Sequence, residues 1–283
     1  MMKIGVIAKP RLEAGEILSG LLSYLKEKKI EAFLDKDTAA VIGEPNALLK
    51  SDIPDLVDLI VVLGGDGTLL GVARLIGRRD VPIFGVNLGS LGFLTEVTLD
   101  ELYPTLDKVI EGHIDYDERL MLTAAVIRHG EQISAYTVLN DIVVNKSALA
   151  KIIDMAAHID GKLVANFKAD GLIVSTPTGS TAYNLAAGGP IVHPNMHSII
   201  LTPICPHVLA NRPVVVMDSS RIEISLLSLD TQVHLTLDGQ VGFSLMGNDV
   251  IRITKAEHTI KLISVPGKNY FDILRTKLKW TER

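Results

Sequence analysis

The chain is organised around the segment Leu59-Ile-Val-Val-Leu-Gly-Gly-Asp-Gly-Thr-Leu-Leu-Gly-Val-Ala-Arg74. Its first five residues are all apolar, which is typical of a strand buried on both faces of a parallel sheet. A glycine-rich turn follows, and then a second apolar stretch that suits a helix. A strand, a glycine turn and a helix start gather free backbone N–H groups at one point, and such a point attracts phosphate. We expect the phosphate contacts to come from Gly64, Gly65, Gly67 and Thr68.

Asp66 is the unexpected residue of this turn, because a carboxylate repels phosphate unless a cation or a reaction accounts for it. A plain solvated turn is one alternative, since Asp-Gly is common in turns. A dinucleotide-binding turn is another, since Gly65, Gly67 and Gly71 are spaced G-x-G-x-x-x-G. This strand is the third of the chain, however, and no acidic residue ends the next one, which disfavours that alternative. We interpret Asp66 as a general base or a metal partner beside bound phosphates.

Composition narrows the class of protein. The chain has 283 residues, 47% of them hydrophobic, and a formal net charge of −5. This length favours two domains, and the acidic balance argues against a general nucleic-acid binder. A single cysteine, Cys205, excludes an internal disulfide and fits a reducing compartment. The sequence shows no signal peptide and no apolar run near the ~20 residues of a membrane span. We therefore expect a cytoplasmic protein that binds neither membranes nor nucleic acids.

Strands and helices alternate in the first part of the chain. Apolar runs predict strands at 3–8, 31–34, 59–63 and 81–87, and amphipathic periodicity predicts helices at 14–28 and 99–112. Residues 35–54 lack a clear period and are predicted to be mostly loop. This alternation is typical of an α/β domain with a parallel sheet, whose ligands bind at the carboxyl ends of the strands.

The pattern changes to period two near residue 116, which predicts a β-rich domain with a hairpin at Asp238-Gly239. The fold class is therefore an α/β N-terminal domain plus a β-rich C-terminal domain. The first domain takes residues 1–115 and the helical tail 266–283, and the second takes 116–265. Met121, Ala125 and Ile127 are apolar on the second face of their strand, which indicates an interface between copies.

A second polar cluster includes the segment Ser175-Thr-Pro-Thr-Gly-Ser-Thr-Ala-Tyr183. One helix cap needs one hydroxyl, so this crowding of hydroxyls favours a polar ligand over plain capping. Lys168 and Asp170 lie two residues apart, which predicts that they share one face of a strand, either as ligand contacts or as a surface ion pair. Asp141 follows Asn140 within an apolar stretch, where burial is costly unless the carboxylate is paired or bound.

These motifs together resemble the NAD kinase family. Their order and spacing agree along nearly the whole chain, in Gly64-Gly-Asp-Gly-Thr68, Asn140-Asp141, Asp170-Gly171, Ser175 to Tyr183, Gly188-Gly-Pro190 and Asp238-Gly-Gln240. The first motif alone is weakly specific, because lipid kinases and phosphofructokinases look similar there, whereas the hydroxyl-rich segment is far more specific. Asn184 and Ala186 stand where serines are frequent in the family, and Asp141 stands where glutamate is also common.

The resemblance implies phosphorylation of the adenosine ribose 2′-hydroxyl of NAD by ATP, giving NADP and ADP. It also implies a divalent cation such as Mg²⁺, a homodimer or homotetramer, and Asp66 as the proton acceptor. By position, NAD would contact Asp66, Gly67, Asn140, Asp141, Lys151, Lys168, Asp170, Thr181, Ala182, Tyr183, Asn184, Leu185, Ala186 and Gln240. Two alternatives stay open: a lipid kinase, which should lack the hydroxyl-rich segment, and a non-catalytic NADP(H)-binding regulator, which needs no Asp66.

Overall fold

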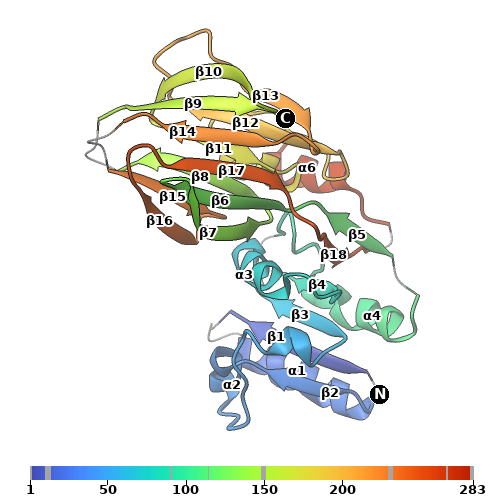
Figure 1. Ribbon diagram of the computed structural model, residues 1–283. Coiled ribbons are helices and arrows are strands. Elements are labelled where there is room, and N and C mark those ends of the chain that lie inside the picture. The colour runs from blue at the N-terminus through green and yellow to red at the C-terminus, as the bar shows by residue number, and fades with distance from the viewer. Residues whose placement is uncertain are drawn as a thin grey trace. The chain divides into compact units, whose positions relative to one another are not determined.

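The computed structural model describes residues 2–9, 14–89, 91–113, 115–147, 151–228, 232–265 and 267–280 (Figure 1). The chain divides into two compact units, Met1–Glu118 with Ile260–Arg283, and Arg119–Thr259. Two strands that the sequence analysis placed in the β-rich domain, β5 (Tyr116–Arg119) and β18 (Ile260–Ile263), belong instead to the sheet of the first unit. Alternating hydrophobicity predicts a half-buried strand but does not identify the sheet that the strand joins.

The sheet of the first unit has six strands in the order β2-β1-β3-β4-β18-β5. The neighbours from β2 to β18 pair in parallel. Besides β5 and β18, the sheet contains β1 (Lys3–Ala8), β2 (Glu31–Leu34), β3 (Leu59–Leu63) and β4 (Ile83–Val86). The helices are α1 (Ala14–Glu27), α2 (Lys36–Ile42), η1 (Ile53–Asp55), α3 (Asp66–Ile76), α4 (Leu99–Ile110) and α6 (Tyr270–Leu278).

β3 is buried on both faces, as its continuous apolar run predicts. Val61 packs in one core with Leu21 of α1 and Leu106 of α4, whereas Val62 is equally buried but points to the opposite face. The α3 helix contacts β3 and β4 through its own buried residues, such as Leu69. Because both faces are covered, the carboxyl ends of the strands are where ligands reach this sheet.

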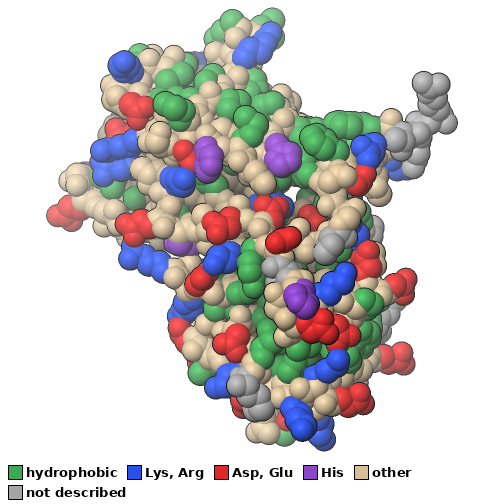
Figure 2. All heavy atoms as spheres, turned by 90° about the vertical axis from the view of Figure 1, so that its right-hand side faces the viewer, with side chains coloured by type: hydrophobic (Ala, Val, Ile, Leu, Met, Phe, Trp, Pro, Cys, Tyr) green, Lys and Arg blue, Asp and Glu red, His purple; other side chains and the backbone are tan. Residues whose placement is uncertain are grey.

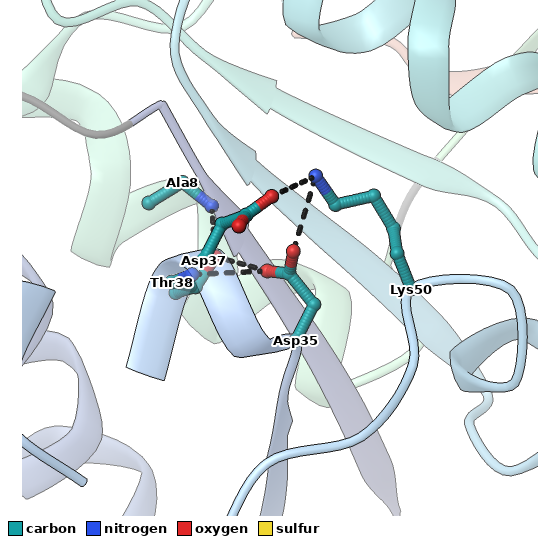
Figure 3. A network of polar contacts seen from close by, with 5 residues as sticks. All are labelled: Ala8, Asp35, Asp37, Thr38 and Lys50. Carbon is teal, nitrogen blue, oxygen red and sulfur yellow. Dashed lines mark hydrogen bonds and ion pairs between the residues drawn. The ribbon is translucent and has the colours of Figure 1, made fainter. Parts of the chain in front are cut away.

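The helix α2 lies where the sequence analysis predicted a loop, and that prediction was wrong. Asp35 caps the helix by accepting the N–H of Thr38 at 3.3 Å, and Gly43 ends it with a φ of 70°. Lys50 forms ion pairs with Asp35 at 3.0 Å and with Asp37 at 3.3 Å (Figure 3). These caps and ion pairs stabilise a helix of seven residues, which is too short for its hydrophobic periodicity to be recognised in the sequence.

The second unit contains two antiparallel six-stranded sheets. One has the order β10-β9-β14-β17-β6-β7, and the other has the order β13-β12-β11-β8-β15-β16. The strands of the first are β6 (Leu122–Arg128), β7 (Glu131–Val138), β9 (Ile153–Ile159), β10 (Lys162–Ala169), β14 (Ile222–Leu226) and β17 (Val250–Lys255). Those of the second are β8 (Asp141–Lys146), β11 (Gly171–Ser175), β12 (Ser198–Ile204), β13 (Val214–Met217), β15 (Val233–Leu237) and β16 (Val241–Leu245). The short helices η2 (Thr178–Thr181) and α5 (Tyr183–Ala186) follow β11.

One hydrophobic core fills the space between these two sheets, with Val126 from one sheet and Val144 from the other. The predicted hairpin is present between β15 and β16, and its turn residues Asp238 and Gly239 both have positive φ, 49° and 64°. Such values match the twist of the flanking strands. The predicted fold class, an α/β domain plus a β-rich domain, is confirmed.

The exposed apolar face that the sequence predicts near residue 121 is not present at Met121 and Ala125. These two residues, expected on an outer face, are only 1% and 8% exposed, so they do not form an open apolar patch. On the face drawn in Figure 2, basic and acidic side chains are interspersed. No helix in the described part of the chain has both the length and the apolar character of a membrane span.

Candidate functional site

The glycine turn of the first unit joins β3 to α3. Gly65 is the N-cap of α3, with an extended backbone (φ −105°, ψ −176°), and no side chain caps the helix. An end without a side-chain cap favours an anion through the helix dipole, although the Thr68 N–H already donates to the Gly65 carbonyl at 2.9 Å. A Cβ on Gly64 would lie 2.6 Å from the hydroxyl oxygen of Thr68, so the turn packs closely against the helix. Thr68 thus supports the turn from within the helix.

A cavity of about 270 Å³ adjoins this turn. Gly64, Gly65 and Asp66 line it, whereas Gly67 and Thr68 do not. Its lining also contains Lys9, Asn87, Leu88, Gly89, Gly92 and Lys277, which are not among the predicted site residues. Of these, Leu88, Gly89 and Gly92 belong to a second glycine-rich turn, at the end of the predicted strand 81–87. Topology carried a signal for two of the others, because Lys9 directly follows β1 and Asn87 directly follows β4 at the carboxyl edge of the sheet.

The Asp66 carboxylate holds the loop that follows β4. Its Oδ1 accepts the N–H of Leu94 at 3.0 Å and both the N–H and the hydroxyl of Thr95 at 3.1 Å. Its Oδ2 accepts the N–H of Phe93 at 2.9 Å. Asp66 is therefore not the plain solvated turn residue of the first alternative. Because Oδ2 takes only one of these four hydrogen bonds, it keeps lone-pair capacity for a further donor.

Asn87 and Gly92 complete this arrangement. The Asn87 Nδ2 donates to the Thr95 hydroxyl at 2.8 Å, and its Oδ1 accepts the N–H of Gly89 at 2.7 Å. A Cβ on Gly92 would overlap the Asp66 Oδ1 and the Thr95 hydroxyl. Only glycine lets the loop pass this close to the carboxylate, so the position of Asp66 depends on both neighbours.

The cavity offers few donors to a metal ion. In the part of the chain that the structure describes, no group of three or more His, Cys, Asp or Glu residues could hold one. Among the lining residues that the structure describes, side-chain oxygens belong to Asp66 and Asn87. Hard oxygen donors suit Mg²⁺, which commonly binds one or two carboxylates together with substrate phosphates. The residues therefore fit an ion that arrives with a phosphate ligand, and they do not form a cage of their own.

The second unit contains a cavity of about 320 Å³. Among the predicted NAD contacts, Asn140, Asp141, Ala182 and Tyr183 line it. The Asn140 Oδ1 is buried and has no hydrogen-bond partner among the described residues, which is the state of an acceptor that a ligand donor would satisfy. Its lining adds residues that the sequence analysis did not assign to NAD, namely Val143, Asn145, Thr236, Asp238 and Gly239.

Asp141 is the buried carboxyl of this cavity, with 4% of its surface exposed. Burial and the nearby charge of Asp238 raise its pKa to about 7, while a hydrogen bond from the backbone of Tyr183 acts in the opposite direction. Asp238 accepts the N–H groups of Asn140 at 2.7 Å and of Asp141 at 3.2 Å. The expected cost of burying Asp141 thus takes the form of a raised pKa, so near pH 7 this carboxyl can donate or accept a hydrogen bond.

The hydroxyl-rich segment is largely used within the fold. The Thr176 hydroxyl donates to the carbonyl of Leu139 at 2.6 Å, and the Ser180 hydroxyl donates to the carbonyl of Val192 at 3.1 Å. Asn184 is fully buried, and its amide bonds to Ser180, Pro190 and Thr202. The hydroxyls of Thr176 and Ser180 and the amide of Asn184 therefore hold the loop together, and a ligand is not needed to explain them.

Lys168 and Asp170 do not share a strand face, because β10 ends at Ala169 and Asp170 lies in the bend before β11. Lys168 lies 3.9 Å from Asp154, and Asp170 lies 3.7 Å from Lys146. Exposed ion pairs of this kind contribute little to stability, so both side chains can exchange partners. The other predicted contacts, Lys151, Thr181, Leu185, Ala186 and Gln240, are not part of the lining of the second cavity.

Comparison with known proteins identifies the family. Residues 4–114 match the ATP-NAD kinase N-terminal domain, and residues 139–265 match the ATP-NAD kinase C-terminal domain. The NAD kinase of Geobacter sulfurreducens is 51% identical over 286 residues, with 100% of both chains covered. The crystal structure of yeast NADH kinase complexed with NADH has a TM-score of 0.91 at 26% identity, covering 100% of this chain and 89% of the yeast chain. The Archaeoglobus fulgidus NAD kinase in complex with ATP has a TM-score of 0.80 at 28% identity, covering 97% and 99%. With matches to both domains and a half-identical relative over its full length, the chain belongs to the NAD kinase family.

Proposed function

We propose that this chain transfers the terminal phosphoryl group of ATP to the 2′-hydroxyl of the adenosine ribose of NAD, giving NADP and ADP. The observation that carries the proposal is the Asp66 carboxylate in a glycine-lined cavity at the N-terminus of α3. A kinase needs backbone donors that hold phosphates and a group that takes the proton of the acceptor alcohol. This cavity supplies both kinds of group.

Asp66 acts as the general base in this proposal. A ribose hydroxyl is a poor nucleophile at neutral pH, and a carboxylate within hydrogen-bond reach accelerates such a step by ~10²–10⁴-fold. We assign the role to Oδ2, because Oδ1 already accepts three hydrogen bonds. As the ribose oxygen bonds to the γ-phosphorus, its proton passes to Oδ2. The bond from the γ-phosphorus to the β,γ-bridging oxygen breaks, and ADP leaves.

The donor phosphates bind at Gly65 and the N-terminus of α3 in this proposal, with Gly64 lining the site, since the Gly64 N–H already donates to the Val86 carbonyl at 2.9 Å. A Mg²⁺ ion bound with them would neutralise their charge next to Asp66, and Asp66 and Asn87 are the residues that would face it. The chain itself positions the phosphates through backbone N–H groups, which do not depend on side-chain rotamers.

NAD binding is proposed for the second unit, at the cavity around Asn140 and Asp141. The unpartnered Asn140 Oδ1 would accept a hydrogen bond from an amino or hydroxyl group of NAD. Lys151, Lys168, Asp170 and Gln240 are added from the family resemblance, as are Thr181, Leu185 and Ala186. For Asn184 the proposal is limited to backbone contact, because its side chain is already bonded within the protein.

We also propose that the chain forms a homodimer or homotetramer through the β13 edge. This strand ends one sheet of the second unit. Val215 and Met217, which are 45% and 68% exposed, lie on its outer face, opposite the core-facing Val216. Leu209, in the preceding turn, is 86% exposed. An exposed apolar edge strand is a template for pairing with another chain, and a second copy presents the same edge.

The direct test uses the purified chain with ATP, Mg²⁺ and NAD, followed by enzymatic detection of NADP. We expect NADP and ADP in equal amounts. Phosphorylation of a diacylglycerol or sphingosine substrate without NADP would identify a lipid kinase. Tight binding of NADP(H) without any phosphoryl transfer would identify a regulator, and either result would overturn the proposal.

A further inference from the structure

We propose that Lys9 and Lys277 form a two-lysine clamp on the phosphate chain of the phosphoryl donor, so that the C-terminal helix α6 completes the donor site. This inference rests on the proposed function, because it assigns a role to these lysines in binding the donor of that reaction. Both residues line the cavity at the glycine turn, although 268 positions separate them in the sequence.

Lys9 is held in place through its backbone. It directly follows β1, and its N–H donates to the carbonyl of Leu63 at 2.9 Å, at the residue that precedes the glycine turn. The N–H of Ala8 donates to the Thr38 hydroxyl at 2.8 Å, and that hydroxyl bonds to the buried Asp35 (Figure 3). The backbone that carries the Lys9 side chain is thus held by two hydrogen bonds, while the residue itself is exposed.

Lys277 reaches the cavity because α6 docks on the first unit. Ile273 and Leu274 are each 2% exposed, and Lys277 lies one turn further along the same side of the helix. The Lys268 ammonium, just before α6, donates to the carbonyl of Glu96 at 2.7 Å and fixes the start of this segment. The Lys277 ammonium lies 5.8 Å from the centroid of the Phe93 ring.

Phe93 connects Lys277 to the catalytic carboxylate. Its N–H donates to the Asp66 Oδ2, so the ring beneath Lys277 belongs to the loop that Asp66 holds. A cation over an aromatic face keeps its charge accessible and has limited freedom to move away. Lys277 is thereby placed at the rim of the phosphate cavity without contacting Asp66 itself.

The charges around the cavity are not balanced. Within the described part of the chain neither Lys9 nor Lys277 forms an ion pair, whereas other lysines, such as Lys28 and Lys261, contact carboxylates. Among the described residues of the lining, Asp66 is the one with an acidic side chain, and its carboxylate already accepts hydrogen bonds from the loop. Two ammonium groups without an ion pair to any described residue, the N-terminus of α3 and the glycine turn therefore present positive potential to one ligand.

A chain of linked phosphates fits this arrangement better than a single phosphate does. Lys9 comes from the end of β1 and Lys277 from a separate helix, so the two cations approach one cavity from different elements. Each lysine carries a point charge with three donors and a flexible stem, which suits the several oxygens of a triphosphate. The clamp is therefore expected to bind the donor and to leave NAD binding unaffected.

The test compares Lys9→Met, Lys277→Met and the double variant with the wild type. Methionine keeps most of the aliphatic stem and removes the charge. We expect the KM for ATP to rise about three- to tenfold for each single variant and at least about tenfold for the double variant. The KM for NAD should stay within about twofold, since a phosphate clamp acts on one substrate only. Lys26→Met, an exposed lysine on α1 outside the cavity, is the matched control and should change neither constant.

A binding measurement without catalysis separates this inference from the proposed function. Titration calorimetry with inorganic tripolyphosphate and Mg²⁺ should show weaker binding in the double variant than in Lys26→Met, by about tenfold or more. Unchanged affinity and an unchanged KM for ATP would overturn the clamp, even if the wild type makes NADP. The proposed function would be refuted, and the clamp retained, if the wild type makes no NADP and the double variant binds tripolyphosphate more weakly than the wild type does. Equal increases in both KM values would indicate a folding defect and would also overturn it.

Discussion

The Oδ1 atom of Asp66 lies 3.1 Å from both the backbone nitrogen and the hydroxyl oxygen of Thr95. Thr95 is fully buried, and its hydroxyl also accepts a hydrogen bond from Asn87. The residue that we assign as the base is therefore also the anchor of a loop. Substitutions at Asp66 have to be interpreted against variants that disturb the loop and keep the carboxylate.

Thr95→Val removes the hydroxyl and nearly preserves the shape of the side chain. The Asn87 amide loses its acceptor, and Asp66 loses one of four donors. We expect a loss of about 1–3 kcal/mol in the free energy of unfolding, measured by urea denaturation. Thr95→Ser keeps the hydroxyl and serves as the control. Equal stability of the valine variant and the wild type would show that this network does not hold the loop.

Gly92→Ala should displace the Asp66 side chain, because the added Cβ would overlap Asp66 Oδ1. We expect a destabilisation of about 1–3 kcal/mol, as for other overpacked sites, together with a fall in kcat. Gly89→Ala is the matched control for stability, since its nearest neighbour would be the Asn87 Oδ1 at 3.9 Å. A crystal structure of Gly92→Ala with the wild-type Asp66 geometry would contradict this prediction.

Asp141→Asn should change how stability depends on pH. The pKa of Asp141 is raised to about 7 in the folded protein, above its ordinary value of 3.8. The folded state therefore binds the proton more tightly, and this contribution to stability is lost as pH rises from about 4 to about 7. The asparagine variant does not lose it, so relative to the wild type it should gain up to roughly 4 kcal/mol between pH 4 and pH 8. Parallel pH profiles of the two unfolding free energies would refute the raised pKa.

Val215→Lys should weaken association between copies if β13 is the interface. A lysine on an exposed edge strand disfavours pairing with another chain. We expect the sedimentation coefficient at micromolar concentration to shift toward that of a monomer. Leu163→Lys, at an exposed position of β10 on the edge of the other sheet, is the control and should leave the assembly intact. A wild type that sediments as a monomer at the same concentration would refute the proposed homo-oligomer.

Local patterns in the sequence were sufficient for the central part of the fold. The apolar run 59–63 predicts β3, and the Asp238-Gly239 pair predicts its hairpin, because both signals depend on neighbouring residues only. The strands β5 and β18 were assigned to the wrong sheet, since pairing with β4 or β18 is decided by contacts far along the chain. The helix α2 was missed because a cap and an ion pair from Lys50 stabilise it, and its own period is too short.

Some residues of the candidate site can likewise be recognised from their sequence neighbours, whereas others are placed by contacts far along the chain. Gly64, Gly65 and Asp66 could be found because one turn contains them all, and Asn140 and Asp141 because they interrupt an apolar run. Lys277 carries no local signal, since it is one lysine in a tail helix and is placed by the docking of α6. The use of Thr176 and Ser180 within the fold could not be foreseen, because their partners Leu139 and Val192 lie 37 and 12 residues away.

The measurement that tests the central assignment most directly is kcat for Asp66→Asn with saturating ATP, Mg²⁺ and NAD. As the general base, Asp66 should account for ~10²–10⁴-fold of kcat, whereas loss of its loop contacts alone should lower stability with a smaller effect on kcat. Thr95→Val supplies the comparison, because it weakens the same loop and keeps the carboxylate. We expect Asp66→Asn to lose at least about 100-fold in kcat while NAD still binds, and Thr95→Val to lose less than about tenfold. A kcat for Asp66→Asn within about threefold of the wild type would remove Asp66 from the chemistry of the reaction.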